Sequence, residues 1–156
     1  MTAVRKAHLN DLPQLAELFD HYRQFYHKTS DLEGARFFLY DRLQKKDSEI
    51  FVVELGTHLA GFTQLYPIFS STRMKRYWLL NDLFVREDFR GHGYARKLIA
   101  AAKERCKNTS ACGILLETDK TNNIGNRLYP SCGFRFYDHA HFYEWENTEI
   151  ESVKNL

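Results

Sequence analysis

Two glycines, Gly91 and Gly93, stand between an apolar run at residues 77–85 and a stretch in which apolar residues recur at helical spacing. Glycines let successive backbone N–H groups point into a turn, and a helix that begins there adds about half a positive charge at its N-terminus. Such a turn binds phosphate groups, with the Arg90 guanidinium as a cationic neighbour. Residues 90–95, Arg-Gly-His-Gly-Tyr-Ala, therefore predict a phosphate-binding loop.

This loop does not match two common phosphate-binding sequence patterns. The dinucleotide fingerprint Gly-x-Gly-x-x-Gly would place its third glycine at Arg96, where close contact between helix and strand leaves no room for a long side chain. The sequence also lacks the Gly-x-x-x-x-Gly-Lys-Ser/Thr loop that binds nucleoside triphosphates. Because a Gly-x-Gly pair alone fits a structural turn equally well, the ligand must be identified from the rest of the chain.

The apolar periodicity predicts one mixed α/β domain over residues 1–156, without a linker or an internal repeat. The expected strands are residues 2–7, 50–55, 59–66, 77–85, 112–116, 134–137 and 140–145. The expected helices are residues 12–22, 31–45, 95–106 and 123–131. This order predicts an antiparallel first half, followed by a parallel crossover through the helix after the glycine loop.

Two motifs carry a family resemblance. Arg90-x-x-Gly93-x-Ala95 resembles the Gln/Arg-x-x-Gly-x-Gly/Ala cofactor motif of the GNAT superfamily of N-acetyltransferases. Downstream, the run from Asn122 to Phe134 resembles that family's second signature, through Asn122-x-x-Gly125-x-x-Leu128-Tyr129 and Cys132-Gly133-Phe134. The resemblance implies a centrally splayed sheet of about six to seven strands flanked by about four helices. It also implies an acetyl-CoA-dependent N-acetyltransferase, with acetyl-CoA as the donor and no metal.

Within that family, residues 80–85 are similar to the strand of the histone/polyamine and diamine acetyltransferase branch. Asn81 departs from the pattern, because diamine acetyltransferases carry a glutamate there. The resemblance further implies that the strand binds the pantetheine arm through its backbone, that the loop holds the pyrophosphate, and that Asn122 contacts the donor. The implied donor-binding residues are Leu83, Phe84, Val85, Arg90, Gly91, His92, Gly93, Tyr94, Ala95, Arg96 and Asn122.

Acetyl transfer to an amine needs a base for the attacking ammonium and an acid for the departing thiolate. The family places a tyrosine near the sulfur, which makes Tyr129 the implied acid. For the base the residues leave three options: Asp82, Glu117, or a water held by Asn81. Side chains alternate along a strand, so Asn81 and Asp82 face opposite sides unless a bulge re-aims one of them. An aromatic wall that includes Tyr26 could receive a cationic amine.

The composition excludes several classes. A net charge of +2, from 22 basic and 20 acidic residues, gives no footprint for nucleic acid. Three cysteines without a close pair argue against a disulfide framework or a zinc site and are typical of the cytoplasm. No stretch approaches the length of a membrane-spanning helix, so neither a membrane nor a nucleic acid is an expected partner.

The acceptor is expected to be the primary amine of a small molecule such as a polyamine or an amino acid, which attacks the thioester directly in a ternary complex. The alternatives are a protein or histone lysine acetyltransferase and a non-catalytic acyl-CoA-binding sensor. Relatives in the family often pair through their C-terminal strands. The aromatic residues between 136 and 145 are compatible with such a homodimer.

Overall fold

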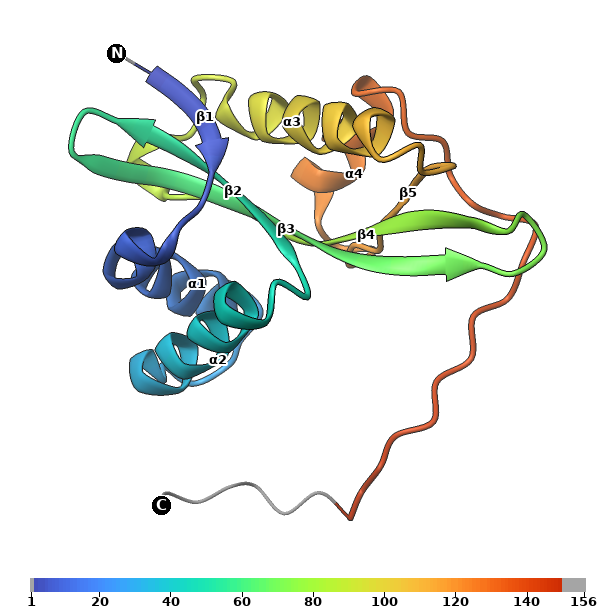
Figure 1. Ribbon diagram of the computed structural model, residues 1–156, viewed down its shortest axis with the longest axis horizontal. Helices are drawn as coiled ribbons and strands as arrows, with labels where there is room; N and C mark the ends of the chain where they lie inside the picture. Colours follow the sequence, from blue (N-terminus) through green and yellow to red (C-terminus); the bar gives the residue numbers. More distant parts are fainter. Residues whose placement is uncertain (1, 150–156) are drawn as a thin grey trace.

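Four consecutive strands form an antiparallel meander, and a fifth strand joins it in parallel at the β4 edge (Figure 1). The computed structural model describes residues 2–149. The strands are β1 (Thr2–Lys6), β2 (Glu49–Leu55), β3 (His58–Ser70), β4 (Lys75–Val85) and β5 (Ile114–Leu115). The helices are α1 (Leu12–Phe25), α2 (Leu32–Lys45), α3 (Tyr94–Asn108) and α4 (Asn123–Ser131). The mixed α/β fold expected from the sequence is therefore confirmed.

Helices cover both faces of the sheet (Figure 1). On one face, α1 and α2 bury Leu15, Leu39 and other apolar residues against Val52 and Phe62 of the strands. On the opposite face, α3 and α4 pack against a second cluster that includes Trp78. Since each helix has one apolar side, this three-layer arrangement lets both faces of the central strands be buried.

A β-bulge interrupts β4 in its middle. Gln64 of β3 pairs with Asp82, and Leu65 pairs with Leu80, so Asn81 between them has no partner across the strand. In a regular strand Leu80 and Asp82 would share a face, because they are two residues apart. Instead, Leu80 belongs to the cluster under α3, whereas Phe84, two residues after Asp82, belongs to the cluster under α1 and α2. The bulge thus re-aims the second half of β4.

β4 and β5 stay together over a short distance only. Their parallel register joins Trp78 to Ile114 and Leu79 to Leu115, whereas β4 continues to Val85. Beyond Leu79 the edge of β4 that faces β5 has no neighbouring strand among residues 2–149. The sheet is therefore splayed in its centre, as the family resemblance implied.

The strands expected at residues 134–137 and 140–145 are wrong, so the described sheet has five strands rather than six or seven. Residues 134–147 form neither helix nor strand. Phe134 still packs against the cluster under α3, but toward residue 147 the chain leads away from the sheet and the helices (Figure 1). Phe136, Tyr143 and Trp145 are 86%, 93% and 83% exposed. An apolar pattern shows that a segment can pack against a core, but a strand also needs an edge within its reach.

Candidate active site

The glycine loop forms the N-terminus of α3. Gly91 and Gly93 have φ angles of +81° and +77°, a conformation that side chains with a Cβ rarely adopt. A Cβ at either position would meet no atom within 4 Å, so the space in front of both glycines is open. Gly93 is the N-cap of α3, and no side chain caps this helix end. The first backbone N–H groups of a 15-residue helix are thus free to bind an anion.

Arg90 folds back over the end of β4. Its Nε donates to the main-chain oxygen of Val85 at 2.9 Å, and its guanidinium lies 5.6 Å from the centroid of the Phe84 ring and 6.0 Å from that of Phe25. Among residues 2–149 no carboxylate forms an ion pair with Arg90, in contrast to Arg86, whose Nε donates to Asp88 at 2.8 Å. Arg90 therefore brings an uncompensated positive charge to the loop.

The other polar side chains of the loop have partners of their own. His92 donates through Nδ1 to the main-chain oxygen of Arg90 at 2.9 Å, and its ring stacks on that of Tyr94. Arg96 points toward α4, where its Nη1 lies 3.6 Å from Sγ of Cys132. Within the loop, the backbone and Arg90 are thus better placed for a phosphate than His92 or Arg96.

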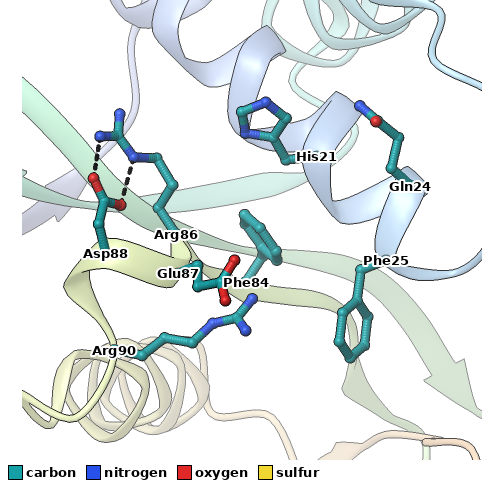
Figure 2. Close-up of a pocket in the computed structure, with 8 residues that line it drawn as sticks. All are labelled: His21, Gln24, Phe25, Phe84, Arg86, Glu87, Asp88 and Arg90. Carbon is teal, nitrogen blue, oxygen red and sulfur yellow. Dashed lines mark hydrogen bonds and ion pairs between the residues drawn. The ribbon is translucent and has the colours of Figure 1, made fainter.

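A cavity of about 640 Å³ opens between α1 and the end of β4, next to this loop (Figure 2). Its lining residues are His21, Gln24, Phe25, Phe84, Arg86, Glu87, Asp88 and Arg90. Figure 2 shows the Phe84 ring at the back, with the Arg90 side chain below it and Phe25 of α1 to one side. Two of the predicted donor-binding residues, Phe84 and Arg90, therefore share one cavity, whereas the glycines lie outside its lining.

Asp82 is the buried carboxylate of the site, with 3% of its surface exposed. Its Oδ2 accepts a hydrogen bond from Nε2 of Gln64 at 2.8 Å, and its Oδ1 accepts one from Nδ2 of Asn81 at 3.1 Å. Burial raises the pKa of Asp82 above its usual value, although its hydrogen bonds, that from Gln64 foremost, oppose this rise. The bulge thus places a carboxylate of increased proton affinity at the splayed edge of the sheet.

Two tyrosines, Tyr22 and Tyr26, lie beside this carboxylate, and a third, Tyr129 of α4, lies next to Tyr26. The Tyr22 hydroxyl donates to the main-chain oxygen of Asn81 at 3.1 Å, and the Tyr26 ring packs edge-on against Tyr22 at 5.1 Å. Burial, followed by the nearby charge of Asp82, raises the pKa of Tyr22 far above its usual range. Burial likewise raises the pKa of Tyr129 to about 12, with smaller contributions from Tyr26 and Cys132. All three hydroxyls consequently stay protonated at neutral pH.

Asn122 lies at the start of α4, and Glu117 lies on the surface. Asn122 caps α4: its Oδ1 accepts from the Gly125 N–H at 3.1 Å, and its Nδ2 donates to the Thr118 hydroxyl at 2.9 Å. A Cβ on Gly125 would lie 2.6 Å from that Nδ2, so this position favours glycine over the alanine of the family motif. Glu117 is exposed, and its charge, together with those of Asp119 and Asp82, contributes to raising the pKa of Tyr26.

The structure thus brings Tyr26, Asn81, Asp82 and Tyr129 into one region, with Glu117 at its rim. Tyr22 of α1 also lies there, and Gln64, a residue that the sequence alone did not single out, completes the region. Gln64 is a polar residue within the apolar run of β3, and this interruption is the feature of the sequence that could have revealed it. Among residues 2–149, no group of three or more His, Cys, Asp or Glu side chains could hold a metal ion. No helix in the same range is long and apolar enough to cross a membrane.

Known proteins resemble this chain over most of its length. The profile of the acetyltransferase (GNAT) family matches residues 13–134, which include both the glycine loop and Tyr129. YhfO of Bacillus subtilis, an uncharacterized N-acetyltransferase, is 41% identical over 131 residues that cover 84% of this chain and 88% of that protein. A probable acetyltransferase of Haemophilus influenzae is 34% identical over 64% of this chain and 68% of its own. The crystal structure of a probable acetyltransferase, 36% identical, has a TM-score of 0.89 and covers 95% of this chain and 99% of that one.

Proposed function

We propose, from the premise that this chain belongs to the acetyltransferase (GNAT) family, that it transfers the acetyl group of acetyl-CoA to a primary amine of a small molecule. Membership of the family makes the chain an acetyl-CoA-dependent acetyltransferase. One arrangement of side chains is the main support for the proposed acceptor and for the proposed catalytic roles. A buried carboxylate, Asp82, lies among tyrosine hydroxyls at the splayed strand edge that leads to the glycine loop.

The residues present fit acetyl-CoA. The uncapped N-terminus of α3 and the open space at Gly91 and Gly93 suit a pyrophosphate, and Arg90 adds a positive charge. The free edge of β4 at Leu83–Val85 offers backbone groups that can pair with the amides of the pantetheine arm, as an added strand would. When bound, the donor supplies a thioester whose carbonyl carbon is open to attack by an amine.

We assign the role of base to Asp82. An attacking amine must lose a proton as its nitrogen forms the new C–N bond, and the best base has a pKa near the working pH. Burial moves the pKa of Asp82 upward, toward that range. Glu117 remains a second candidate, because it is exposed at the rim of the same region. A water held by Asn81 is a third, but the Asn81 amide already donates to Asp82.

We assign the role of acid to Tyr129, which would return a proton to the thiolate as the C–S bond breaks. A pKa of about 12 keeps this hydroxyl protonated at neutral pH. Its ring packs edge-on against Phe134 at 5.9 Å, so the side chain is held in one orientation. Asp82 would take the proton of the amine, and Tyr129 would give a proton to the thiolate. The amine can therefore attack the thioester directly, without a covalent acyl-enzyme.

A small cationic amine is the acceptor that the surroundings favour. Tyr22 and Tyr26 present aromatic faces, and the negative charges of Asp82, Glu117 and Asp119 act on the Tyr26 hydroxyl. The loops that connect the helices and strands from β1 to α4 are short and contain no insertion of the size that a bound peptide would need. A polyamine or an amino acid fits these conditions better than a histone tail.

The test is a panel of amines, amino acids and lysine peptides, with free CoA thiol measured against hydrolysis alone. We expect small amines to raise thiol release, and Asp82→Asn and Tyr129→Phe to abolish most of the increase. Thiol release with lysine peptides only would make the chain a protein acetyltransferase. Binding of acetyl-CoA in a calorimeter without release for any acceptor would make it a sensor.

We further propose that two copies of the chain pair through residues 134–147. Phe136, Phe142, Tyr143 and Trp145 are at least three-quarters exposed, and apolar surface of this extent is more typical of an interface than of solvent-facing chain. The three cysteines are free, which suits a reducing compartment such as the cytoplasm. Sedimentation equilibrium of the full chain at micromolar concentration should give the dimer mass, and a monomer mass would contradict this pairing.

A further inference from the structure

Gln64 is a fully buried amide in the central strand β3, with none of its surface exposed. Apart from Thr63, its neighbours along the buried part of this strand, such as Phe62 and Leu65, are apolar. A buried amide without partners is strongly destabilising, so its hydrogen bonds explain why it is tolerated. Nε2 donates to Asp82 at 2.8 Å and to the Tyr66 hydroxyl at 3.0 Å, and Oε1 accepts from the Ser48 hydroxyl at 3.0 Å.

These contacts fix which way the amide points. Ser48 can serve Oε1 because a hydroxyl is able to donate, whereas an ionised carboxylate can only accept. The N–H side of Gln64 must therefore face Asp82 whenever Asp82 is ionised. An amide turned the other way would set two acceptors against each other.

The two oxygens of Asp82 consequently have different surroundings. Oδ2 faces the interior of the sheet and is bound by the immobile Gln64. Oδ1 faces Asn81, an exposed residue at the bulge whose long contact of 3.1 Å can be exchanged for another donor. Only Oδ1 thus lies on the side from which an amine can approach.

We propose that Gln64 is a positioning residue for the acetyl transfer, because it holds Oδ2 of Asp82 within the sheet and leaves Oδ1 to take the proton of the attacking amine. This role rests on the proposed function of Asp82 as the base. Gln64 also favours the ionised form of the carboxyl, since its N–H can bind the carboxylate but gains little from the protonated acid. Removal of the amide should then make Asp82 a group that ionises only at higher pH.

Few groups other than Gln64 can change the proton affinity of Asp82. Within residues 2–149, the titratable groups that face Asp82 are the hydroxyls of Tyr22 on α1, of Tyr26 directly after α1 and of Tyr66 on β3. Among the described residues, no lysine, arginine or histidine forms an ion pair with Asp82. A change at Gln64 therefore acts on Asp82 through one hydrogen bond and not through a network of charges.

The test compares Gln64→Leu with the wild type in the full-length protein. Leucine nearly keeps the volume of the side chain and removes the amide. The midpoint of the Asp82 carboxyl, followed by its ¹³Cγ chemical shift, should rise by about one pH unit, the size expected for the loss of a hydrogen bond to a charged group. The acidic limb of kcat/KM for the amine should shift by the same amount, with KM for acetyl-CoA unchanged.

Thr63→Val is the matched control. Thr63 is equally buried on the same strand, and its hydroxyl donates to the main-chain oxygen of Asp82 at 2.8 Å, so it contacts the same residue but not the carboxylate. We expect neither midpoint to move in this variant. An unchanged carboxyl midpoint in Gln64→Leu, or an equal shift in Thr63→Val, would overturn the proposal.

Two further measurements separate this proposal from its premise. If Asp82→Asn kept wild-type activity, Asp82 would not be the base, and the positioning role of Gln64 would be overturned with it. The ¹³C midpoint would still show whether Gln64 sets the proton affinity of the carboxyl. If Gln64→Leu failed to fold, Ser48→Ala would replace it, because it removes the donor that orients the amide. A smaller rise of the Asp82 midpoint is then expected, and no rise would contradict the proposal.

Discussion

Two buried aspartates of this chain should respond in opposite ways to the same substitution. Asp82 has no cationic partner among the described residues, and burial raises its pKa. Burial would also raise the pKa of Asp20, but hydrogen bonds outweigh it and the pKa is lowered. Asp20 accepts from the Ser30 hydroxyl at 2.6 Å and from the Asp31 N–H at 2.8 Å, with Arg23 at 3.6 Å. The charge of Asp82 thus destabilises the fold, whereas that of Asp20 stabilises it.

The pH dependence of each effect follows from the direction of its shift. Above the ordinary value of 3.8 the unfolded chain releases the Asp82 proton while the folded chain keeps it. The wild type therefore loses stability as the pH rises from 3.8 to the folded pKa, by about 1.4 kcal/mol for each unit of the shift. Asp82→Asn has no such loss and can still accept from Gln64. It should gain stability over the wild type across this range and hold a constant advantage above it.

Asp20→Asn should behave in the opposite way. The stabilisation by the Asp20 charge is complete above the ordinary value of 3.8 and is lost as the pH falls through the lower, folded pKa. At pH 7 the variant should be less stable by about 2 kcal/mol, the size expected for hydrogen bonds to a charged group. The deficit should shrink once the pH falls below 4.

The assay is urea denaturation, followed by far-ultraviolet circular dichroism, at several pH values between 3 and 8. Activity is measured in parallel, and kcat/KM of Asp82→Asn should fall by about 10²–10⁴-fold, the usual contribution of a general base. Asp82→Asn would then be more stable and less active than the wild type. The reasoning is refuted if Asp82→Asn loses stability by an amount that does not vary with pH, or if both variants change stability with the same sign.

Three further predictions concern the acid, the loop and the C-terminal segment. Tyr129→Phe should lower kcat by about 100-fold with KM for acetyl-CoA within twofold, because the hydroxyl is needed for the leaving thiolate, and an unchanged kcat would remove it from the mechanism. Gly93→Ala, at a φ of +77°, should lower the stability of the protein by about 1 kcal/mol and raise KM for acetyl-CoA. The control Gly56→Ala, at a similar φ of +60° far from the loop, should lower the stability alone. The double variant Phe142→Ser and Trp145→Ser should sediment as a monomer with its circular dichroism spectrum unchanged, and a persisting dimer would exclude this segment as the interface.

The sequence predicted the central elements well, because their information is local. Gly91 and Gly93 mark a turn that few other residues can adopt, and the apolar periodicity after them predicts α3. The second motif likewise predicts α4, whose N-terminal cap is the Asn122 side chain. In such segments the residue types alone are enough to predict the local conformation.

The rest depends on contacts between distant segments. No local feature of residues 80–85 shows that Asn81 is the unpaired residue, because the bulge exists only relative to β3. Which of Asn81 and Asp82 faces the acceptor side therefore does not follow from the sequence alone. The aromatic residues of 134–145 predicted two strands for the same reason, since their pattern does not show whether a strand edge lies within reach.

The bulge at Asn81 also determines which kinds of change β4 can accept. Residues before and after it obey opposite parity, since Leu80 faces the α3 layer while Asp82 faces the α1 layer. Deletion of Asn81 would make Leu80 and Asp82 consecutive residues of a regular strand, which would keep their partners Leu65 and Gln64 and their opposite faces. The deletion would instead remove the main-chain oxygen that accepts from the Tyr22 hydroxyl and the amide that donates to Oδ1 of Asp82. The extra residue at the centre of β4 therefore contributes to the polar contacts of the site and is not needed for the packing of the strand on either layer.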